Sequence, residues 1–554
     1  MRCARTFLCC LLGGMLVAAA AIGAEQPSEQ PRPIDGRGKR QDGDGGGERR
    51  GRGGGRELAV PPELAGRRLL NIVLGRPTDH SIAVSLLSAA DIDAQVEYGA
   101  EAGRYGAHSE PLACKAGTPA ELELKGLQPN TRYYYRLLTR PMGGGPFQPG
   151  AEGTFHTQRA PGSTFAFAVQ GDSHPEREGR MYDPSLYAQT VQRVAKDIPD
   201  FYLTMGDDFS LDRLILQNTF SQEAVNRIYA HQRNFLGVVG QTSALFLVNG
   251  NHEHAELCLL DGTENNPAVM AGRARTLFYP LPAPDAFYTG NTEEVKFVGL
   301  PRDYYAWQWG DALFVVIDLY WHSPLPVDHE PGTGRARPDD RRGGRQGEQK
   351  RGGGKGGGKG GQGGGGKDGE GGGERNPGGR REPWGATLGE AQYRWLTRTL
   401  SESKARWKFV FCHHVLGTGR GGIELADQFE WGGKDRDGQY VFPQKRPGWP
   451  LPIHQLMAEN GVTIFFQGHD HIFCRQQLDG VVYQSCPNPA DATYQAFNRE
   501  AYRSGDILPN SGHLRITVAP QKVGVDYIRS YLPKDATKEH PDGELAFHYD
   551  ILAP

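Results

Sequence analysis

The sequence has little cysteine, and the cysteines follow no framework spacing. Only 8 of 554 residues are cysteine, and the N-terminal apolar segment contains Cys3, Cys9 and Cys10. The remaining five, an odd number, are Cys114, Cys258, Cys412, Cys474 and Cys486. This pattern excludes a disulfide-rich scaffold, so we expect a fold that does not depend on bridges, although export would permit one or two.

Strong net charge and long internal apolar runs are also lacking. The formal net charge is −3, which indicates neither a nucleic-acid partner nor an acidic one. No apolar run after the N-terminus is long enough to cross a bilayer, so we expect no transmembrane segment in the mature chain.

The N-terminus reads as an export signal. Arg2 and Arg5 precede an apolar run over residues 7–23, and small residues stand just before Glu25. This order predicts a signal peptide over residues 1–24 and an exported protein, periplasmic or secreted. A membrane-anchoring helix is the alternative, but the run is shorter than the ~20 residues that a span needs.

Glycine is abundant but concentrated in two segments. Residues 25–66 combine Gly and Arg with few aromatics, and residues 329–383 include "GGGKGGGKGGQGGGGKDGEGGG". Both are too polar to pack, so we predict a disordered linker over 25–66 and a disordered Gly/Lys/Arg-rich insertion over 329–383.

Residues 67–158 read as a small all-β domain. Ile82, Val84 and Leu86 alternate with polar or small neighbours, and so do Ala94 and Val96. The later stretch "LQPNTRYYYRL" resembles the tyrosine corner of fibronectin type III-like sandwiches, in which a Tyr hydroxyl bonds back to the backbone. We therefore expect a fibronectin type III-like β-sandwich here.

From residue 163 to 554 short apolar runs alternate with helical patterns. The runs "FAFAV", "FYLTM", "ALFLV", "LFVVIDL", "KFVF" and "VTIFF" predict strands, and "HLRITVA" with "VGVDYI" predicts a hairpin that completes a second sheet. Helices are predicted over Leu186–Asp197, Leu211–Val239 and Pro452–Asn460, and from a Thr387–Glu390 capping box to near Ser403. This alternation indicates an α/β domain.

Five short polar motifs each follow one of these apolar runs. They are Asp172-Ser-His174, Gly206-Asp207, Gly250-Asn251-His252-Glu253, His413-His414 and Gly468-His469-Asp470-His471. Any one of them alone is compatible with an ordinary turn. Because open α/β sheets bind ligands at the carboxyl ends of their strands, all five together predict one shared site.

The residue types suit a pair of metal ions. Carboxylate, amide and imidazole ligands without thiolate favour Zn, Mn or Fe, and one aspartate can bridge two ions. In an extended segment, two histidines separated by one residue point to opposite sides, so "HDH" can serve both ions.

The motif set resembles the calcineurin-like metallophosphoesterase superfamily, with its D-x-H, G-D, G-N-H-E, H and G-H-x-H blocks. The resemblance implies a four-layer α/β/β/α sandwich and two metal ions that share a bridging hydroxide. It implies that Asp172, His174 and His471 hold the first ion, that Asn251, His413 and His469 hold the second, and that Asp207 bridges both. His414 is the alternative to His413.

The same resemblance assigns further roles. His252 would donate a proton to the leaving oxygen or stabilise the transition state, and Glu253 would orient His252. Asn251 and His252 are also candidate contacts to the substrate phosphate. Outside the resemblance, His254 directly after "GNHE" and Arg420 in "GTGRGG" are further candidates, with a solvated loop histidine and a plain surface arginine as the respective alternatives.

The β-sandwich in front of the catalytic domain resembles the layout of purple acid phosphatases. Two departures stand out: Ser210 occupies the position of the colour-giving tyrosine, and His174 is a histidine those enzymes lack. We therefore expect the general ligand set and no purple absorption.

The resulting hypothesis is an exported, dinuclear metal-dependent phosphoesterase acting on a phosphate-ester substrate, with acid phosphatase-like monoesterase action favoured. Phosphodiesterase action at the same centre is the first alternative. A non-catalytic binding scaffold is the second, but degenerate members are expected to lose ligands and none is missing here.

Overall fold

A computed structural model describes residues 59–254, 260, 262–324, 327 and 383–553. The predicted signal peptide, Cys258, most of the linker and all of the insertion except Pro383 lie outside these residues. Within the described ranges, every helix is too short or too polar to cross a lipid bilayer.

The first strands form an all-β sandwich of two sheets, in the orders β1-β2-β6 and β4-β3-β7-β8, with β5 on β3. The strands are β1 (Leu70–Gly75), β2 (Ser81–Ser88), β3 (Ile92–Gly99), β4 (Ala107–His108), β5 (Leu112–Cys114), β6 (Ala120–Lys125), β7 (Arg132–Pro141) and β8 (Gln148–His156). Alternating residues such as Ile82, Val84 and Val96 meet in one buried core between the sheets. The Tyr133 hydroxyl accepts a 2.9 Å hydrogen bond from the Gln128 backbone N–H, so this tyrosine bonds back to the backbone five residues upstream.

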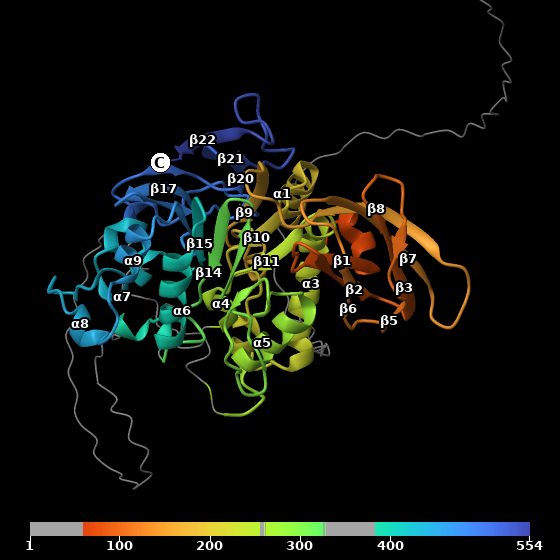
Figure 1. Ribbon diagram of the computed structural model, residues 1–554, viewed down its shortest axis with the longest axis horizontal. Helices are drawn as coiled ribbons and strands as arrows, with labels where there is room; N and C mark the ends of the chain where they lie inside the picture. The colour runs from red at the N-terminus through yellow and green to blue at the C-terminus, as the bar shows by residue number, and fades with distance from the viewer. Residues whose placement is uncertain (1–58, 255–259, 261, 325–326, 328–382, 554) are drawn as a thin grey trace, which may run out of the picture. The chain divides into compact units, whose positions relative to one another are not determined.

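The rest of the chain builds two larger sheets, with strand orders β11-β10-β9-β20-β21-β22 and β12-β13-β14-β15-β16-β18-β17-β19 (Figure 1). The first contains β9 (Phe165–Gln170), β10 (Phe201–Thr204), β11 (Ala244–Leu247), β20 (Gly512–Ala519), β21 (Lys522–Arg529) and β22 (Leu545–Leu552). The second contains β12 (Thr289–Gly290), β13 (Tyr305–Trp309), β14 (Ala312–Val316), β15 (Trp407–Cys412), β16 (Ile464–Gln467), β17 (Phe473–Leu478), β18 (Val481–Ser485) and β19 (Asp506–Leu508). β20 and β21 pair antiparallel, which confirms the predicted hairpin.

The side-chain period of two sorts the apolar residues of these strands into layers. In β9, Phe167 and Val169 enter the core between the two sheets, whereas Ala168 faces the helices on the other side. In β15, Phe409 and Phe411 enter the same inter-sheet core, whereas Val410 faces a second helical layer. The fold is therefore an α/β/β/α sandwich preceded by an all-β sandwich, as the sequence predicts.

Helices cover both outer faces (Figure 1). The six-stranded sheet is covered by α1 (Pro184–Asp197), α3 (Gln222–Gly240) and α5 (Pro267–Phe278). The eight-stranded sheet is covered by α6 (Gly389–Glu402), α7 (Phe429–Gly432) and α9 (Ile453–Glu459). Short helices α2 (Asp212–Leu216), α4 (Asn251–His254) and α8 (Phe442–Lys445) lie in the connections.

Three local predictions need correction. The single helix expected over 211–239 is two helices, because Asn218 takes a left-handed conformation and the Ser221 side chain caps a new helix at the Ala224 N–H. The linker also ends before residue 66, because Pro62–Arg68 forms a 3₁₀-helix that buries Leu64.

The Thr387–Glu390 capping box does not form. Helix α6 begins after Leu388, which makes no side-chain cap. The Glu390 carboxylate instead accepts hydrogen bonds from Arg394 and from the Trp449 indole. The Leu388 N–H that needs a partner donates to the buried Glu430 carboxylate at 2.8 Å, so a tertiary contact caps this helix.

One buried arginine connects the β-sandwich to the α/β domain. Arg233 of α3 is fully buried and donates to the Asn71 and Ser85 side chains and to the Ser85 backbone carbonyl. It also donates to the carbonyl of Phe278 at the end of α5. All of these acceptors are neutral, and the only other contact to the charge among the described residues is the Tyr279 ring, whose centroid lies 5.9 Å from the guanidinium carbon.

Candidate metal centre

The five motifs lie at one edge of the two sheets. β9, β10 and β11 run parallel in one sheet, and β15 and β16 run parallel in the other. Each of these strands ends within three residues of its motif: Asp172 follows β9, Asp207 follows β10, Asn251 follows β11, His413 follows β15, and His469 follows β16. The strand-end placement predicted from the sequence is therefore found.

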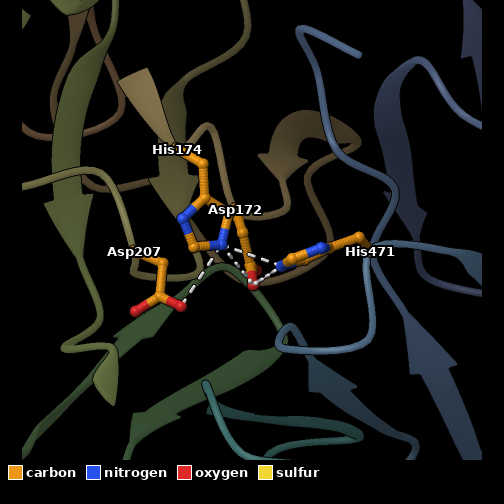
Figure 2. A group of neighbouring side chains, drawn as sticks. All are labelled: Asp172, His174, Asp207 and His471. Carbon is orange, nitrogen blue, oxygen red and sulfur yellow. Dashed lines mark hydrogen bonds and ion pairs between the residues drawn. The ribbon is translucent and has the colours of Figure 1, made fainter. Parts of the chain in front are cut away.

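The first ligand group consists of Asp172, His174, Asp207 and His471, whose side chains point toward one another in Figure 2. The Nε2 atoms of His174 and His471 are 2.8 Å apart. Nε2 of His471 lies 3.0 Å from the Asp172 carboxylate, and Nε2 of His174 lies 3.5 Å from the Asp207 carboxylate. Such spacing suits donors that share one ion, and metal-ligand distances near 2.0–2.2 Å put neighbouring ligands about 3 Å apart.

The second group consists of Asn251, His413 and His469, together with the same Asp207. The Asn251 Oδ1 atom lies 3.0 Å from His413 Nε2 and 3.0 Å from His469 Nδ1. His413 Nε2 is 3.4 Å from Asp207 Oδ2. Asp207 thus belongs to both groups, which is the geometry that a bridging ligand needs.

The donor chemistry fits metal ions. Burial lowers the pKa of His174, His469 and His471, which favours the neutral imidazole that binds metal. His413 Nδ1 donates to the Met205 carbonyl at 2.7 Å, and this fixes its tautomer so that Nε2 presents a lone pair to the site. His174 Nδ1 contacts the Glu176 carboxylate at 2.8 Å and is oriented in the same way.

The backbone around the centre is strained where the ligands stand. His174, Asp207, His469 and His471 all have φ between 50° and 66°. A left-handed conformation costs a non-glycine residue about 1–2 kcal/mol and is concentrated at functional sites. The expectation that His469 and His471 sit on an extended segment is therefore wrong, although the two rings do serve different groups.

Two glycines, Gly250 and Gly468, leave space for carboxylates from neighbouring loops. A Cβ on Gly250 would lie 2.1 Å from an Asp207 carboxylate oxygen. A Cβ on Gly468 would lie 2.5 Å from an Asp172 carboxylate oxygen. The glycines of "GNHE" and "GHDH" are thus needed because the carboxylates of other loops pack directly against them.

Of the adjacent histidines, His413 faces the centre. His414 Nδ1 contacts the Tyr320 hydroxyl at 2.9 Å, and the His414 ring stacks on His469 with centroids 4.2 Å apart. His414 therefore supports a ligand-bearing loop from behind.

His252 lies at the centre, but its orienting partner differs from the prediction. Its backbone N–H donates to Asp207 Oδ1 at 2.9 Å, and its Nδ1 contacts the Asp212 carboxylate at 2.9 Å. Burial lowers the pKa of His252, but the charges of Asp207 and Asp212 outweigh it and raise the pKa to about 9. The carboxylate that contacts the His252 ring is therefore that of Asp212 and not that of Glu253.

Glu253 instead organises the backbone beneath the centre. Its carboxylate accepts hydrogen bonds from the backbone N–H groups of Asp207, Asp208, Phe209 and Gly250, at 2.8 to 3.2 Å. Because these donors belong to two motif loops, Glu253 ties the Asp207 loop to the "GNHE" loop.

The two remaining predicted substrate contacts are Arg420 and His254. Arg420 donates to the buried Asp470 carboxylate at 2.7 Å and to the His469 carbonyl, so it is committed to an ion pair. His254 ends helix α4, but its side chain lies outside the described part of the structure. Ser210 is buried, and its hydroxyl accepts from the Asp212 N–H.

Sequence reasoning missed Asp212, Glu176 and also Arg177, whose NH2 group lies 3.1 Å from Nε2 of His252. None of them belongs to a motif block, and Asp212 reaches His252 only because α2 folds back on the "GNHE" loop. Glu176 and Arg177 follow "DSH" directly, and their closeness to His174 was the signal that could have found them.

Comparison with known proteins was made on sequence and on structure. No protein-family model matches the chain, and no curated protein sequence matches it. Among solved structures, PhoD aligns over 87% of this chain and 88% of its own, with a TM-score of 0.54 and 13% identity. The chain shares its fold with PhoD.

Two further solved structures are similar in part. Purple acid phosphatase PPD1 from yellow lupin (Lupinus luteus) seeds aligns over 88% of this chain and 74% of its own, with 14% identity and a TM-score of 0.48. An FN3 domain of human collagen XX aligns over 16% of this chain and 85% of its own, with 23% identity and a TM-score of 0.13.

Proposed function

We propose that the protein is an exported, dinuclear metal-dependent phosphoesterase that hydrolyses phosphate esters. The supporting observation is the convergence of five strand-end loops on two ligand groups that share Asp207. When bound, two ions of Fe, Zn or Mn would polarise the phosphoester and lower the pKa of the attacking water.

The chain's own residues would place and protonate the substrate. Asp172, His174 and His471 would hold one ion, Asn251, His413 and His469 the other, and Asp207 both. His252 would face the phosphoryl group through Nε2 while its Nδ1–H donates to Asp212. The carboxylates of Asp207 and Asp212 favour the doubly protonated ring, which is the form whose Nε2–H can donate to the leaving oxygen.

Monoester hydrolysis is favoured over diester hydrolysis. The motif blocks together with a preceding β-sandwich resemble acid phosphatases, and this resemblance supports monoester action. A panel of chromogenic mono- and diesters assayed on the metal-loaded chain tests the preference. Faster turnover of every diester than of its matched monoester would reverse it.

Asp207→Asn is the decisive variant for the centre. The amide removes the negative charge shared by both groups, so we expect loss of at least one ion and a fall in kcat of ~10²-fold or more. Asp437→Asn, on an exposed turn, is the matched control and should keep parental metal content and turnover. Unchanged activity and metal content in Asp207→Asn would refute the assignment.

A non-catalytic scaffold is distinguished by elemental analysis. The phosphoesterase proposal expects two ions per chain and loss of turnover on chelation, with recovery on adding metal back. A purified chain that takes up no metal and hydrolyses no ester in the panel would instead support the scaffold.

Export is tested on the chain itself. The N-terminal pattern supports removal of residues 1–24, so the mature protein should begin near Glu25 and appear outside the cytoplasm. N-terminal sequencing together with cell fractionation would show this, and an intact Met1 on a cytoplasmic protein would contradict it.

A further inference from the structure

Arg177 stands beside the proposed proton donor. Its NH2 group is 3.1 Å from Nε2 of His252, the atom proposed to face the substrate. Its side chain is 31% exposed, whereas the side chains of His174 and Asp207 are at most 2% exposed. Arg177 therefore lies where the buried centre opens to solvent.

The guanidinium is only partly engaged. Its Nε pairs with the Glu176 carboxylate at 3.2 Å. Its NH1 contacts the sulfur of Met181 at 3.0 Å, and its NH2 contacts the His252 imidazole. Neither of these partners is an anion, so the two terminal nitrogens can exchange them for phosphoryl oxygens with a large gain in hydrogen-bond strength.

Arg420, the other arginine near the centre, is held differently. Its guanidinium pairs with the buried Asp470 carboxylate at 2.7 Å, and Arg420 would have to break that ion pair to bind substrate.

We propose that Arg177 binds the phosphoryl group of the substrate and selects phosphate monoesters. This inference rests on the proposed function. A bound monoester has three terminal oxygens and two negative charges near neutral pH, so one oxygen is left over when two face the metal ions. A diester has only two such oxygens and would present its second ester group to Arg177.

The variants Arg177→Gln and Arg177→Lys test this in the metal-loaded full chain. Losing charge-assisted hydrogen bonds is expected to lower kcat/KM for a monoester by ~10–10²-fold in Arg177→Gln and to weaken inorganic phosphate binding similarly. Turnover of a matched diester should change by less than about 3-fold. Arg177→Lys should lose less than Arg177→Gln, because lysine keeps the positive charge but not the paired N–H donors of the guanidinium.

Arg180→Gln is the matched control, since Arg180 is exposed on the same loop and only its backbone N–H contacts Arg177. Both Gln variants should retain parental metal content. Equal phosphate affinity in the parent and in Arg177→Gln, or equal losses for monoester and diester, would overturn the inference.

Failure of the proposed function gives a different result. A parent that turns over no ester, yet binds inorganic phosphate in a manner that Arg177→Gln weakens, would leave the anion site standing and refute only the enzyme. A parent that hydrolyses esters with Arg177→Gln indistinguishable from it would refute only the role of Arg177.

Discussion

His513 offers a quantitative test of the interior of the six-stranded sheet. It lies on β20, between β9 and β21, and is fully buried. Neither ring nitrogen has a hydrogen-bond partner among the described residues. Burial first, and then the charges of Arg193 and Arg515, lower its pKa from 6.5 to about 3.

The sign of the pH dependence follows from this shift. The folded-state pKa is below the unfolded one, so the unfolded chain binds the proton more tightly and stability falls as the pH drops below 6.5. The loss is about 1.4 kcal/mol per pH unit, or about 2 kcal/mol between pH 6.5 and 5. At pH 7.5 the neutral ring still leaves two polar atoms unpaired, at a cost of about 1–3 kcal/mol.

His513→Leu should therefore be more stable than the parent at pH 7.5, and its advantage should grow by about 2 kcal/mol at pH 5. Urea unfolding at several pH values measures both quantities. Metal release in acid affects the parent and the variant alike and cancels in the difference. The control, His80→Leu, changes an exposed ring and should follow the parent curve.

A difference between parent and His513→Leu that stays constant from pH 7 to pH 5 would refute this reasoning. It would mean that the ring reaches water or a partner in the folded protein. A destabilised variant with the predicted acid slope would instead show that leucine packs poorly while the titration argument holds.

Two other perturbations follow from the structure. Asp212→Asn should lower kcat by ~10–10²-fold with metal content unchanged. It should also move the alkaline fall of the kcat–pH profile to lower pH, because His252 loses a negative neighbour and its pKa drops. An alkaline fall at the parental pH would contradict this. Arg233→Met leaves buried acceptors on Asn71 and Ser85 unpaired, so it should lower the free energy of unfolding by about 3–5 kcal/mol. Urea denaturation measures this loss, with Arg180→Met at an exposed position as the control. A loss under about 1 kcal/mol would show that water already hydrogen-bonds to these acceptors.

Much of the candidate site was predictable, because its residues follow continuous apolar strands. The chain direction defines the carboxyl end of a buried strand in an α/β sheet, so the sequence alone predicts that Asp172, Asp207 and His413 lie at one edge. The choice of His413 over His414 rested on order after the strand, and the alternation of side chains in β15 agrees with it.

The partners of these residues were not predictable in the same way. Asp212 meets His252, and Glu253 meets the Asp207 loop, through folded connections whose path depends on tertiary packing. The same reason explains why the capping box does not form: the Leu388 N–H at the start of α6 donates to Glu430, which is distant in sequence. The left-handed conformations of His469 and His471 were not predictable either, because short-range preferences disfavour that conformation.

The neutral hydrogen-bond acceptors around Arg233 have a consequence for how the chain can be divided. Cutting the chain after residue 158 would separate the β-sandwich from the α/β domain. Such a fragment would carry an arginine stripped of Asn71 and Ser85, and an apolar patch on α3 and β11 that Val73 now covers. The N-terminal sandwich thus forms part of the packing of the α/β domain, so we expect the two to unfold together.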